Sequence, residues 1–227
     1  MSPTSSSGTQ DRWLMEPEAL ELLSRYDLPL IPHRLTTSPE EAARAARTLG
    51  CPVAMKVVAA HLIHKSDVGG VSLNISTPEE AAELFTALYD RLTPHVTPGA
   101  LHGILVEKMA DPGIEVIVGM VRDMQFGPAI MVGLGGVFVE LYKDVTFRLP
   151  PLSFAVARSM FAELRAAPLL TGYRGQAPRD LDALAGCAST VARIAAERAD
   201  IQEIDLNPII AYERGCTIVD AKIRVGL

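Results

Sequence analysis

Between residues 104 and 149 the chain breaks into short apolar segments joined by turns, and this pattern constrains the fold more than any other feature. Most segments are separated by Gly, Pro or Asp, and short strands joined in this way form antiparallel meanders. Helical patterns lie before and after the region, and strict strand–helix alternation is absent after residue 100. The pattern predicts the α+β class. The strand-like segments are residues 104–109, 114–121, 129–132, 137–141 and 145–149.

Helix start signals occur twice in the N-terminal half. Ser38 and Thr77 each precede a proline at the first helical position, and Glu41 and Glu80 complete the capping pattern. The first of these helices is expected to end at Gly50, because glycine favours helix C-termini. Periodicity predicts further helices over residues 17–26, 153–164 and 179–198, and further strands over residues 53–58, 71–75, 201–206 and 217–222.

Composition argues against two classes of partner. A net charge of -6 with 21% charged residues gives no basic surface, so we expect no nucleic acid partner. No apolar run approaches the roughly eighteen residues of a membrane span, so we expect no membrane partner and a cytoplasmic protein. Residues 1–15 are expected to be a disordered tail, since residues 2–10 lack apolar spacing. The cysteines at 51, 187 and 216 are far apart and odd in number, which predicts reduced core thiols.

Two glycine-rich stretches, residues 68–70 and 133–136, lie between predicted strands. Backbone amides near glycine can approach phosphate oxygens closely, although each stretch also fits a tight hairpin turn. The first stretch follows His64, Lys65, Ser66 and Asp67. A histidine can attack phosphorus and leave again near neutral pH, and a neighbouring carboxylate can orient its second nitrogen. The alternative is a solvated loop with a surface histidine.

Lys56 lies inside the apolar strand predicted at residues 53–58. Burying an unpaired ammonium is unfavourable unless a negative group meets it. A nucleotide phosphate would serve. The alternative is a lysine on the solvated side of a half-buried strand.

Acidic and amide side chains gather near the C-terminus. Glu203, Asp205 and Asn207 alternate with apolar residues and so share one side of a strand. Asp220 lies on the next predicted strand, which could bring it beside Asn207. Magnesium prefers a few such oxygen ligands, completed by phosphate oxygens. An exposed hairpin with acids on one face is the alternative.

The order of several segments resembles the ADP-forming acetyl-CoA synthetase β subunit, a relative of the succinyl-CoA synthetase β subunit. The likeness runs from about residue 17 to the C-terminus. It is carried by residues 51–56 (CPVAMK), 64–71 (HKSDVGGV), 106–109 (VEKM), 113–119 (GIEVIVG), 126–127 (FG), 133–140 (GLGGVFVE), 143–148 (KDVTFR), 172–175 (GYRG) and 205–208 (DLNP).

This resemblance implies the ATP-grasp fold, with an N-terminal lobe over residues 16–103, a C-terminal lobe over residues 104–227 and ATP or ADP between them. Lys56 would meet the phosphates, and Glu115 would lie at or near the ribose. The adenine would be lined at the hinge between the lobes by Val106, Glu107, Lys108 and Met109.

The same resemblance assigns Asn207 and Asp220 to Mg²⁺, while Asp205 stands where the succinyl relative has a glutamate. It assigns His64 as the phosphate carrier. It gives no firm role to Glu140, Arg148 or Arg174, although the two arginines could clamp phosphate.

The resemblance implies the nucleotide-binding subunit of an NDP-forming acyl-CoA synthetase. Its CoA-binding α subunit or domain would complete a hetero-oligomer and supply acyl-CoA and phosphate. Two alternatives stay open: a non-catalytic sensor, as in relatives joined to an acetyltransferase, and a ligase that forms an acyl phosphate directly. The sequence leaves open the acyl group, the choice of ATP or GTP, and the direction of flux.

Overall fold

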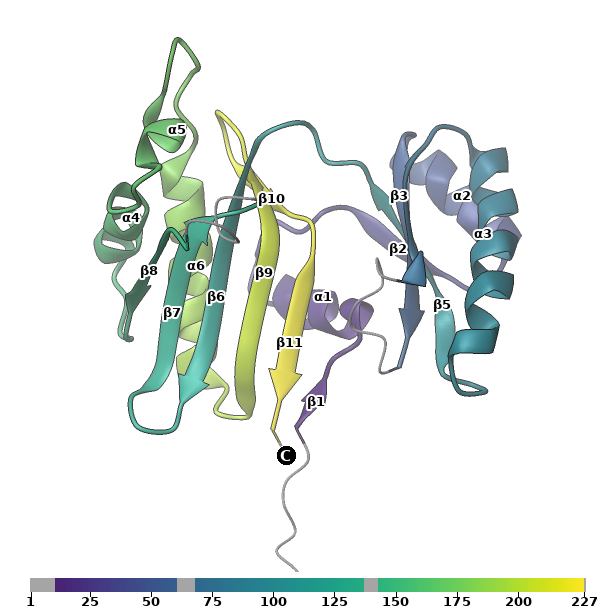
Figure 1. Ribbon diagram of the computed structural model, residues 1–227, viewed down its shortest axis with the longest axis horizontal. Helices are drawn as coiled ribbons and strands as arrows, with labels where there is room; N and C mark the ends of the chain where they lie inside the picture. The colour runs from purple at the N-terminus through teal and green to yellow at the C-terminus, as the bar shows by residue number, and fades with distance from the viewer. Residues whose placement is uncertain (1–10, 61–67, 137–142, 227) are drawn as a thin grey trace, which may run out of the picture.

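Two antiparallel sheets form the protein, as a computed structural model that describes residues 11–60, 68–136 and 143–226 shows (Figure 1). The larger sheet has the order β1-β11-β9-β6-β7-β8, with β10 also paired to β9, and the smaller has the order β2-β5-β3-β4. The strands are β1 (Arg12–Trp13), β2 (His33–Thr36), β3 (Val53–Ala59), β4 (Val71–Ile75), β5 (Leu101–Lys108), β6 (Ile114–Asp123), β7 (Gly127–Leu134), β8 (Val145–Arg148), β9 (Ile201–Ala211), β10 (Cys216–Ile218) and β11 (Ala221–Val225).

Capping side chains begin the helices where the sequence predicts. Ser38 accepts a hydrogen bond from the N–H of Glu41, and Thr77 accepts one from the N–H of Glu80. Gly50 ends the first of these helices with a φ of 81°, a conformation that favours glycine. The helices are α1 (Glu16–Ser24), α2 (Pro39–Leu49), α3 (Pro78–Leu92), the 3₁₀ turn η2 (Thr93–His95), α4 (Phe154–Ala162), α5 (Ala167–Thr171) and α6 (Leu181–Glu197).

The small lobe consists of the four-stranded sheet with α2 and α3 on its outer face (Figure 1). Alternate residues of β3 and β5 point into the core under these helices, and Met55 and Val106 are fully buried there. The intervening residues face the opposite way. Val58 and Leu105 therefore join the main core of the protein instead, together with Leu20 of α1.

The large lobe consists of the seven-stranded sheet and the helices that pack on one of its faces. Ile204 and Leu206 of β9 point into that core and are buried. The residues that alternate with them, Glu203, Asp205 and Asn207, face the other side, as the strand period predicts. This second face therefore carries the acidic and amide side chains that the sequence singles out.

The connections differ from the sequence expectations at two places. β5 leaves the central meander and pairs with β2 and β3 in the small sheet, so the expected lobe boundary between residues 103 and 104 falls inside one strand. α1 packs in the core of the large lobe, although it lies in the range expected for the N-terminal lobe. Both differences have one reason. Local sequence patterns predict whether a segment is a strand or a helix, but the element it packs against depends on residues far away in the sequence.

Several local expectations also need correction. Residues 12 and 13 of the expected disordered tail form β1, which pairs with β11, and Arg224 of that strand lies over the ring of Trp13. β2 and α5 were not predicted, because both are short. Cys51 is exposed rather than a core thiol. The expected strand at 137–141 and most of the expected tail lie outside the described residues.

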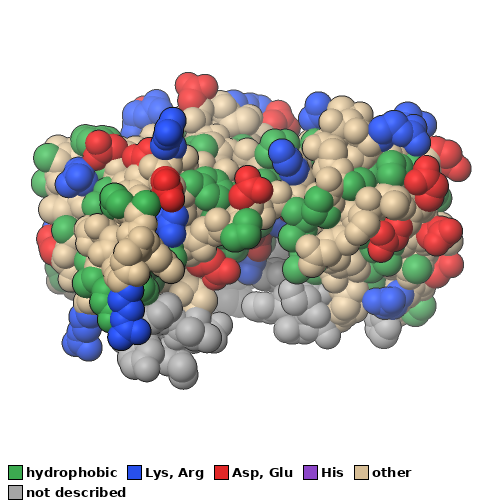
Figure 2. All heavy atoms as spheres, turned by 90° about the horizontal axis from the view of Figure 1, so that it is seen from above, with side chains coloured by type: hydrophobic (Ala, Val, Ile, Leu, Met, Phe, Trp, Pro, Cys, Tyr) green, Lys and Arg blue, Asp and Glu red, His purple; other side chains and the backbone are tan. Residues whose placement is uncertain are grey.

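Charge is mixed over the face that Figure 2 shows, where acidic and basic side chains are interspersed on both lobes. No strongly basic surface is visible on this face, in keeping with the net charge of -6. Within the described residues, no helix combines the length and the apolar character needed to cross a membrane.

Candidate functional site

A buried lysine joins the two lobes. Nζ of Lys56 lies 2.8 Å from Oε1 of Glu16, 2.8 Å from Oε2 of Glu107 and 2.9 Å from the carbonyl oxygen of Val219. The side chains at the centre of this cluster are buried: Lys56 is 8% exposed, Glu16 6% and Glu107 1%. Because Glu16 and Val219 belong to the large lobe and Lys56 and Glu107 to the small sheet, the lysine is a contact between lobes.

Strand alternation explains how the sequence places these charges together. Lys56 and Glu107 lie on the face of β3 and β5 that is turned away from α2 and α3. On the neighbouring strand, Val71 is the register partner of Lys56. β4, the strand that follows the His64 stretch in the sequence, therefore begins directly beside the lysine. His64 itself lies outside the described residues.

Two carboxylates, Glu16 and Glu107, share the single ammonium of Lys56 in this cluster. The excess of negative charge affects the pKa values of the group. Burial raises the pKa of Glu107 to about 7, against the opposing effect of Lys56. Burial acts to lower the pKa of Lys56, but Glu16, Glu107 and Asp220 outweigh it and raise that pKa. Among the described residues, Oε1 of Glu107 has no hydrogen-bond partner. That oxygen can carry a proton or accept a hydrogen bond from a ligand.

The expected adenine segment uses much of its backbone inside the protein. The N–H of Lys108 donates to the carbonyl of Pro32 at 2.9 Å, and that of Met109 donates to the carbonyl of Pro52 at 3.1 Å. Val106 points into the small core and is fully buried. The side chain of Lys108 is exposed and remains accessible to a bound base.

The two glycine stretches have different roles in the described structure. The carbonyl of Gly70 accepts a hydrogen bond from Val57 at 2.8 Å, beside Lys56. The N–H of Gly135 donates to the carbonyl of Glu115 at 2.8 Å, and a Cβ on Gly135 would lie 2.8 Å from Cβ of Glu115. Glycine is needed there so that the end of β7 can approach β6. Glu115 stays exposed at this edge.

The two expected metal ligands, Asn207 and Asp220, are joined by a hydrogen bond between their backbones. The N–H of Asn207 donates to the carbonyl of Asp220 at 3.2 Å, next to Val219, which contacts Lys56. Nearby, burial raises the pKa of Asp205, and Lys222, its register partner, opposes this effect. Within the described part of the chain, no three acidic, His or Cys side chains converge on one metal position. The amide and carboxylate oxygens of Asn207 and Asp220 fit Mg²⁺ that takes further oxygens from phosphate and water.

Glu16 is the site residue that sequence reasoning missed. Its position in the first turn of α1 has an ordinary explanation, because acidic residues favour helix N-termini. Only the packing of α1 between the lobes shows that this side chain reaches Lys56 (Figure 1).

The residues without a firm role divide into three groups. Arg148 donates to Oε2 of Glu163 at 2.6 Å, so its guanidinium already has a carboxylate partner. Arg174 lies over the ring of Tyr173. Glu140, like Lys65, Ser66 and Asp67, lies outside the described residues.

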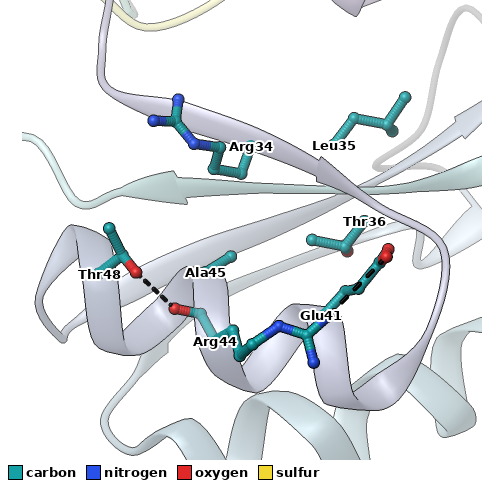
Figure 3. A pocket seen from close by; sticks show the side chains of 7 residues that line it. All are labelled: Arg34, Leu35, Thr36, Glu41, Arg44, Ala45 and Thr48. Carbon is teal, nitrogen blue, oxygen red and sulfur yellow. Dashed lines mark hydrogen bonds and ion pairs between the residues drawn. The ribbon is translucent and has the colours of Figure 1, made fainter.

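A surface hollow of about 350 Å³ between β2 and α2 contains none of the expected site residues (Figure 3). Its polar groups are largely occupied: the hydroxyl of Thr36 donates to the carbonyl of Ile104, and Arg44 pairs with Glu41. The hollow also lies on the helix-covered side of the small lobe. We therefore place the candidate site at the Lys56 cluster, where charges from both lobes meet.

Comparison with known proteins identifies the family of the chain. The chain matches the ATP-grasp domain over residues 6–225. It is 44% identical over 214 residues to the β subunit of ADP-forming acetate–CoA ligase I from Pyrococcus furiosus, covering 94% of this chain and 92% of that one. It is 39% identical over 209 residues to the ADP-forming acetate–CoA ligase I of Archaeoglobus fulgidus, of whose length it spans 30%.

Solved structures show the same likeness. The dinucleotide-forming acetyl-coenzyme A synthetase 1 of Ca. Korarchaeum cryptofilum, in complex with coenzyme A, Ca-AMPCP and HgCl⁺, matches with a TM-score of 0.89 and 45% identity over 94% of this chain and 93% of that chain. A second structure of that enzyme holds coenzyme A and Mg-AMPPCP, with its phosphohistidine segment pointing towards the nucleotide site; it matches with a TM-score of 0.83 and 42% identity over 94% and 93% of the two chains.

The two antiparallel sheets that meet at Lys56 thus form an ATP-grasp domain. The expected α+β, ATP-grasp fold is thus confirmed. The chain belongs to the ATP-grasp family, in the group of ADP-forming acetyl-CoA synthetase β subunits.

Proposed function

We propose that this chain is the nucleotide-binding subunit of an NDP-forming acyl-CoA synthetase. The complete enzyme interconverts acid, CoA and ATP with acyl-CoA, ADP and phosphate. The observation that carries the proposal is Lys56, a buried cation at the junction of the lobes, beside the strand that follows His64. The relatives' complexes with nucleotide analogues support it.

Phosphate transfer would run through His64. A ring nitrogen of His64 attacks the terminal phosphorus of ATP, a P–N bond forms, and the P–O bond to ADP breaks. The phosphohistidine then gives its phosphoryl group to the partner. Lys56 would hold phosphate oxygens in place during transfer, and positioning of this kind is the main contribution of a protein to phosphoryl transfer. Magnesium held by Asn207 and Asp220 would offset charge on the phosphates.

A CoA-binding α subunit is the proposed partner, and acyl-CoA and phosphate would bind through it in a cytoplasmic hetero-oligomer. The fused relative supports this assignment, because the present chain corresponds to only 30% of its length. The choice of acid would then reside mainly in the partner. We assign residues 106–109 to the adenine and Glu115 to the ribose in the same proposal.

The decisive experiment follows phosphate on His64. The chain is mixed with its α partner, acyl-CoA, phosphate and ADP, and ATP formation is measured together with acid-labile, alkali-stable phosphate on the protein. His64→Ala should abolish both signals. His102→Ala is the matched control, since His102 is an exposed residue of β5 away from the cluster, and it should retain both.

The same experiment separates the alternatives. Full ATP formation by His64→Ala would overturn the phosphocarrier role. Binding of Mg-ATP by the wild-type chain with no phosphohistidine in the presence of the partner would indicate a sensor. Ligation of an acid by the isolated chain, without a phosphohistidine, would indicate a direct acyl-phosphate ligase.

A further inference from the structure

Two cysteines that the proposed reaction does not use lie in contact inside the large lobe. Sγ of Cys187, on α6, is 3.6 Å from Sγ of Cys216, the first residue of β10. The two residues are 2% and 7% exposed, and both belong to the main hydrophobic core. The sequence separates them by 29 positions, so tertiary structure alone makes them a pair.

Hydrogen bonds hold the two elements of this pair together. Asp180 caps α6 by accepting from the N–H of Ala183 at 2.9 Å, and its other oxygen accepts from the N–H of Gly215 at 2.8 Å. Gly215 immediately precedes Cys216. The N–H of Asp180 also donates to the carbonyl of Tyr212 at 2.8 Å. The start of α6 and the β9–β10 turn therefore form one unit, which keeps both sulfur atoms in reach of each other.

The contact also makes the two thiols unequal. The hydrogen bond between them, followed by burial, raises the pKa of Cys187, whereas the same hydrogen bond lowers the pKa of Cys216. Cys216 is thus the thiol that ionises more readily. It is also the more exposed of the two. A thiolate is the nucleophile in disulfide exchange.

We propose that Cys187 and Cys216 are a modification site, which small-molecule disulfides convert to an intramolecular disulfide. The Cys216 thiolate attacks one sulfur of the oxidant, which forms a mixed disulfide and releases one thiolate. Cys187 then loses its proton and attacks Sγ of Cys216, which forms the protein disulfide and releases the second thiolate. The protein loses two hydrogens, and the oxidant is reduced to two thiols.

The geometry requires little movement. A disulfide has an S–S bond of about 2.05 Å, so the sulfur atoms must approach by about 1.5 Å. The bond would tie α6 to β10, and β10 leads directly to Val219, whose carbonyl accepts from Lys56. Disulfide formation would thus fasten to α6 the strand that ends beside the candidate nucleotide site.

The test uses the full chain with Cys51→Ser, which removes the exposed thiol. The protein is incubated with oxidised glutathione, free thiols are alkylated after acid quenching and unfolding, and intact mass and peptide maps are recorded. We expect a mass loss of about 2 Da before alkylation, no alkylated cysteine and a Cys187–Cys216 cross-linked peptide. Dithiothreitol should restore both thiols. Circular dichroism should show the native fold in the oxidised protein.

Addition of Cys187→Ala provides the matched control, since it leaves Cys216 without a resolving thiol. This variant should gain only a glutathione adduct. If it does not fold, the peptide map of the Cys51→Ser protein decides the question alone. Two alkylatable thiols after oxidation of the folded Cys51→Ser protein, or a cross-link that forms only in denaturant, would overturn the proposal. Neither outcome depends on nucleotide binding.

Discussion

Nζ of Lys56 lies 2.8 Å from Oε1 of Glu16, so a strand of the small sheet and a helix of the large lobe share a buried ion pair. Glu107 contacts the same ammonium from within the small sheet. The cation expected to meet phosphate is therefore held by two carboxylates. A nucleotide must compete with these carboxylates or bind beside them.

Replacing Lys56 with Met should destabilise the protein strongly. The substitution removes the ammonium that Glu16 and Glu107 both contact while their carboxylates stay buried, and breaking a buried ion pair by removing one partner costs about 3–5 kcal/mol. Urea denaturation at pH 7 measures the effect. Lys143→Met, at an exposed position, should change the free energy of unfolding by less than about 0.5 kcal/mol. Equal losses in the two variants would contradict the structural role of Lys56.

Glu16→Gln should strengthen nucleotide binding. Glutamine keeps an oxygen that can accept from Lys56, but it removes a negative charge that competes with phosphate. We expect the Kd for Mg-ATP to fall about threefold to tenfold, which corresponds to about 0.7–1.4 kcal/mol. Calorimetry of the binding measures this change. Glu21→Gln, on the exposed side of the same helix where Glu21 pairs with Arg25, should leave the Kd unchanged. Weaker binding by Glu16→Gln would show that Glu16 positions Lys56 for the nucleotide instead of competing with it.

Stability should depend on the titration of Glu107. Burial raises its pKa from the ordinary value of 4.5 to about 7, so the folded protein holds this proton more tightly than the unfolded chain. Both states are protonated below pH 4.5, and both are ionised above about pH 7. The contribution of Glu107 to the free energy of unfolding therefore falls as pH rises between these values.

Glu107→Gln should remove this contribution, because glutamine does not titrate. Denaturation of the wild type and the variant between pH 4 and pH 8 gives the difference in unfolding free energy at each pH. We expect that difference to change through the interval and to level off on either side. A difference that is constant with pH would show that Glu107 titrates alike in the folded and unfolded states.

Gly135→Ala should disturb the large sheet where the end of β7 meets the start of β6, because the new Cβ would lie 2.8 Å from Cβ of Glu115. Backbone must move to relieve this contact, and we expect a loss of about 1–3 kcal/mol. Gly186→Ala is the matched control. Gly186 lies inside α6, where an added Cβ meets no atom within 4 Å, so alanine should stabilise the helix by about 0.5–1 kcal/mol. Thermal denaturation of the two variants should shift in opposite directions, and a similar shift in both would contradict the close approach at Gly135.

Much of the local structure could be predicted because its causes are local. Ser38 and Thr77 cap their helices through neighbours three positions away, and Gly50 supplies the positive φ at a helix end. The alternation of Glu203, Asp205 and Asn207 likewise follows from the strand period. β1 and β2 could not be predicted, because they are too short to show a strand period. Each pairs with a strand that lies far away in the sequence.

The candidate site could be predicted only in part. The expected proximity of Asn207 and Asp220 is present in the backbone. The expected strand position of Asp220 is wrong, because this residue lies in the connection between β10 and β11, which returns the chain to β9. The glycines at 133–136 had two open interpretations, and the structure assigns Gly135 to a close approach between β7 and β6. The roles of His64, Lys56 and the hinge residues in the reaction stay predictions.

Local patterns account for the helix starts after Ser38 and Thr77 and for the faces of the strands. They also show that Lys56 lies in an apolar strand, where it needs a negative partner. The groups that meet Lys56 come from distant segments and depend on how these segments pack. Glu16 is 40 positions from Lys56 and Val219 is 163 positions away. Such contacts depend on how α1, β3 and the β10–β11 connection pack around a common core, and packing follows from the shapes and areas buried by many residues together, which no local pattern encodes.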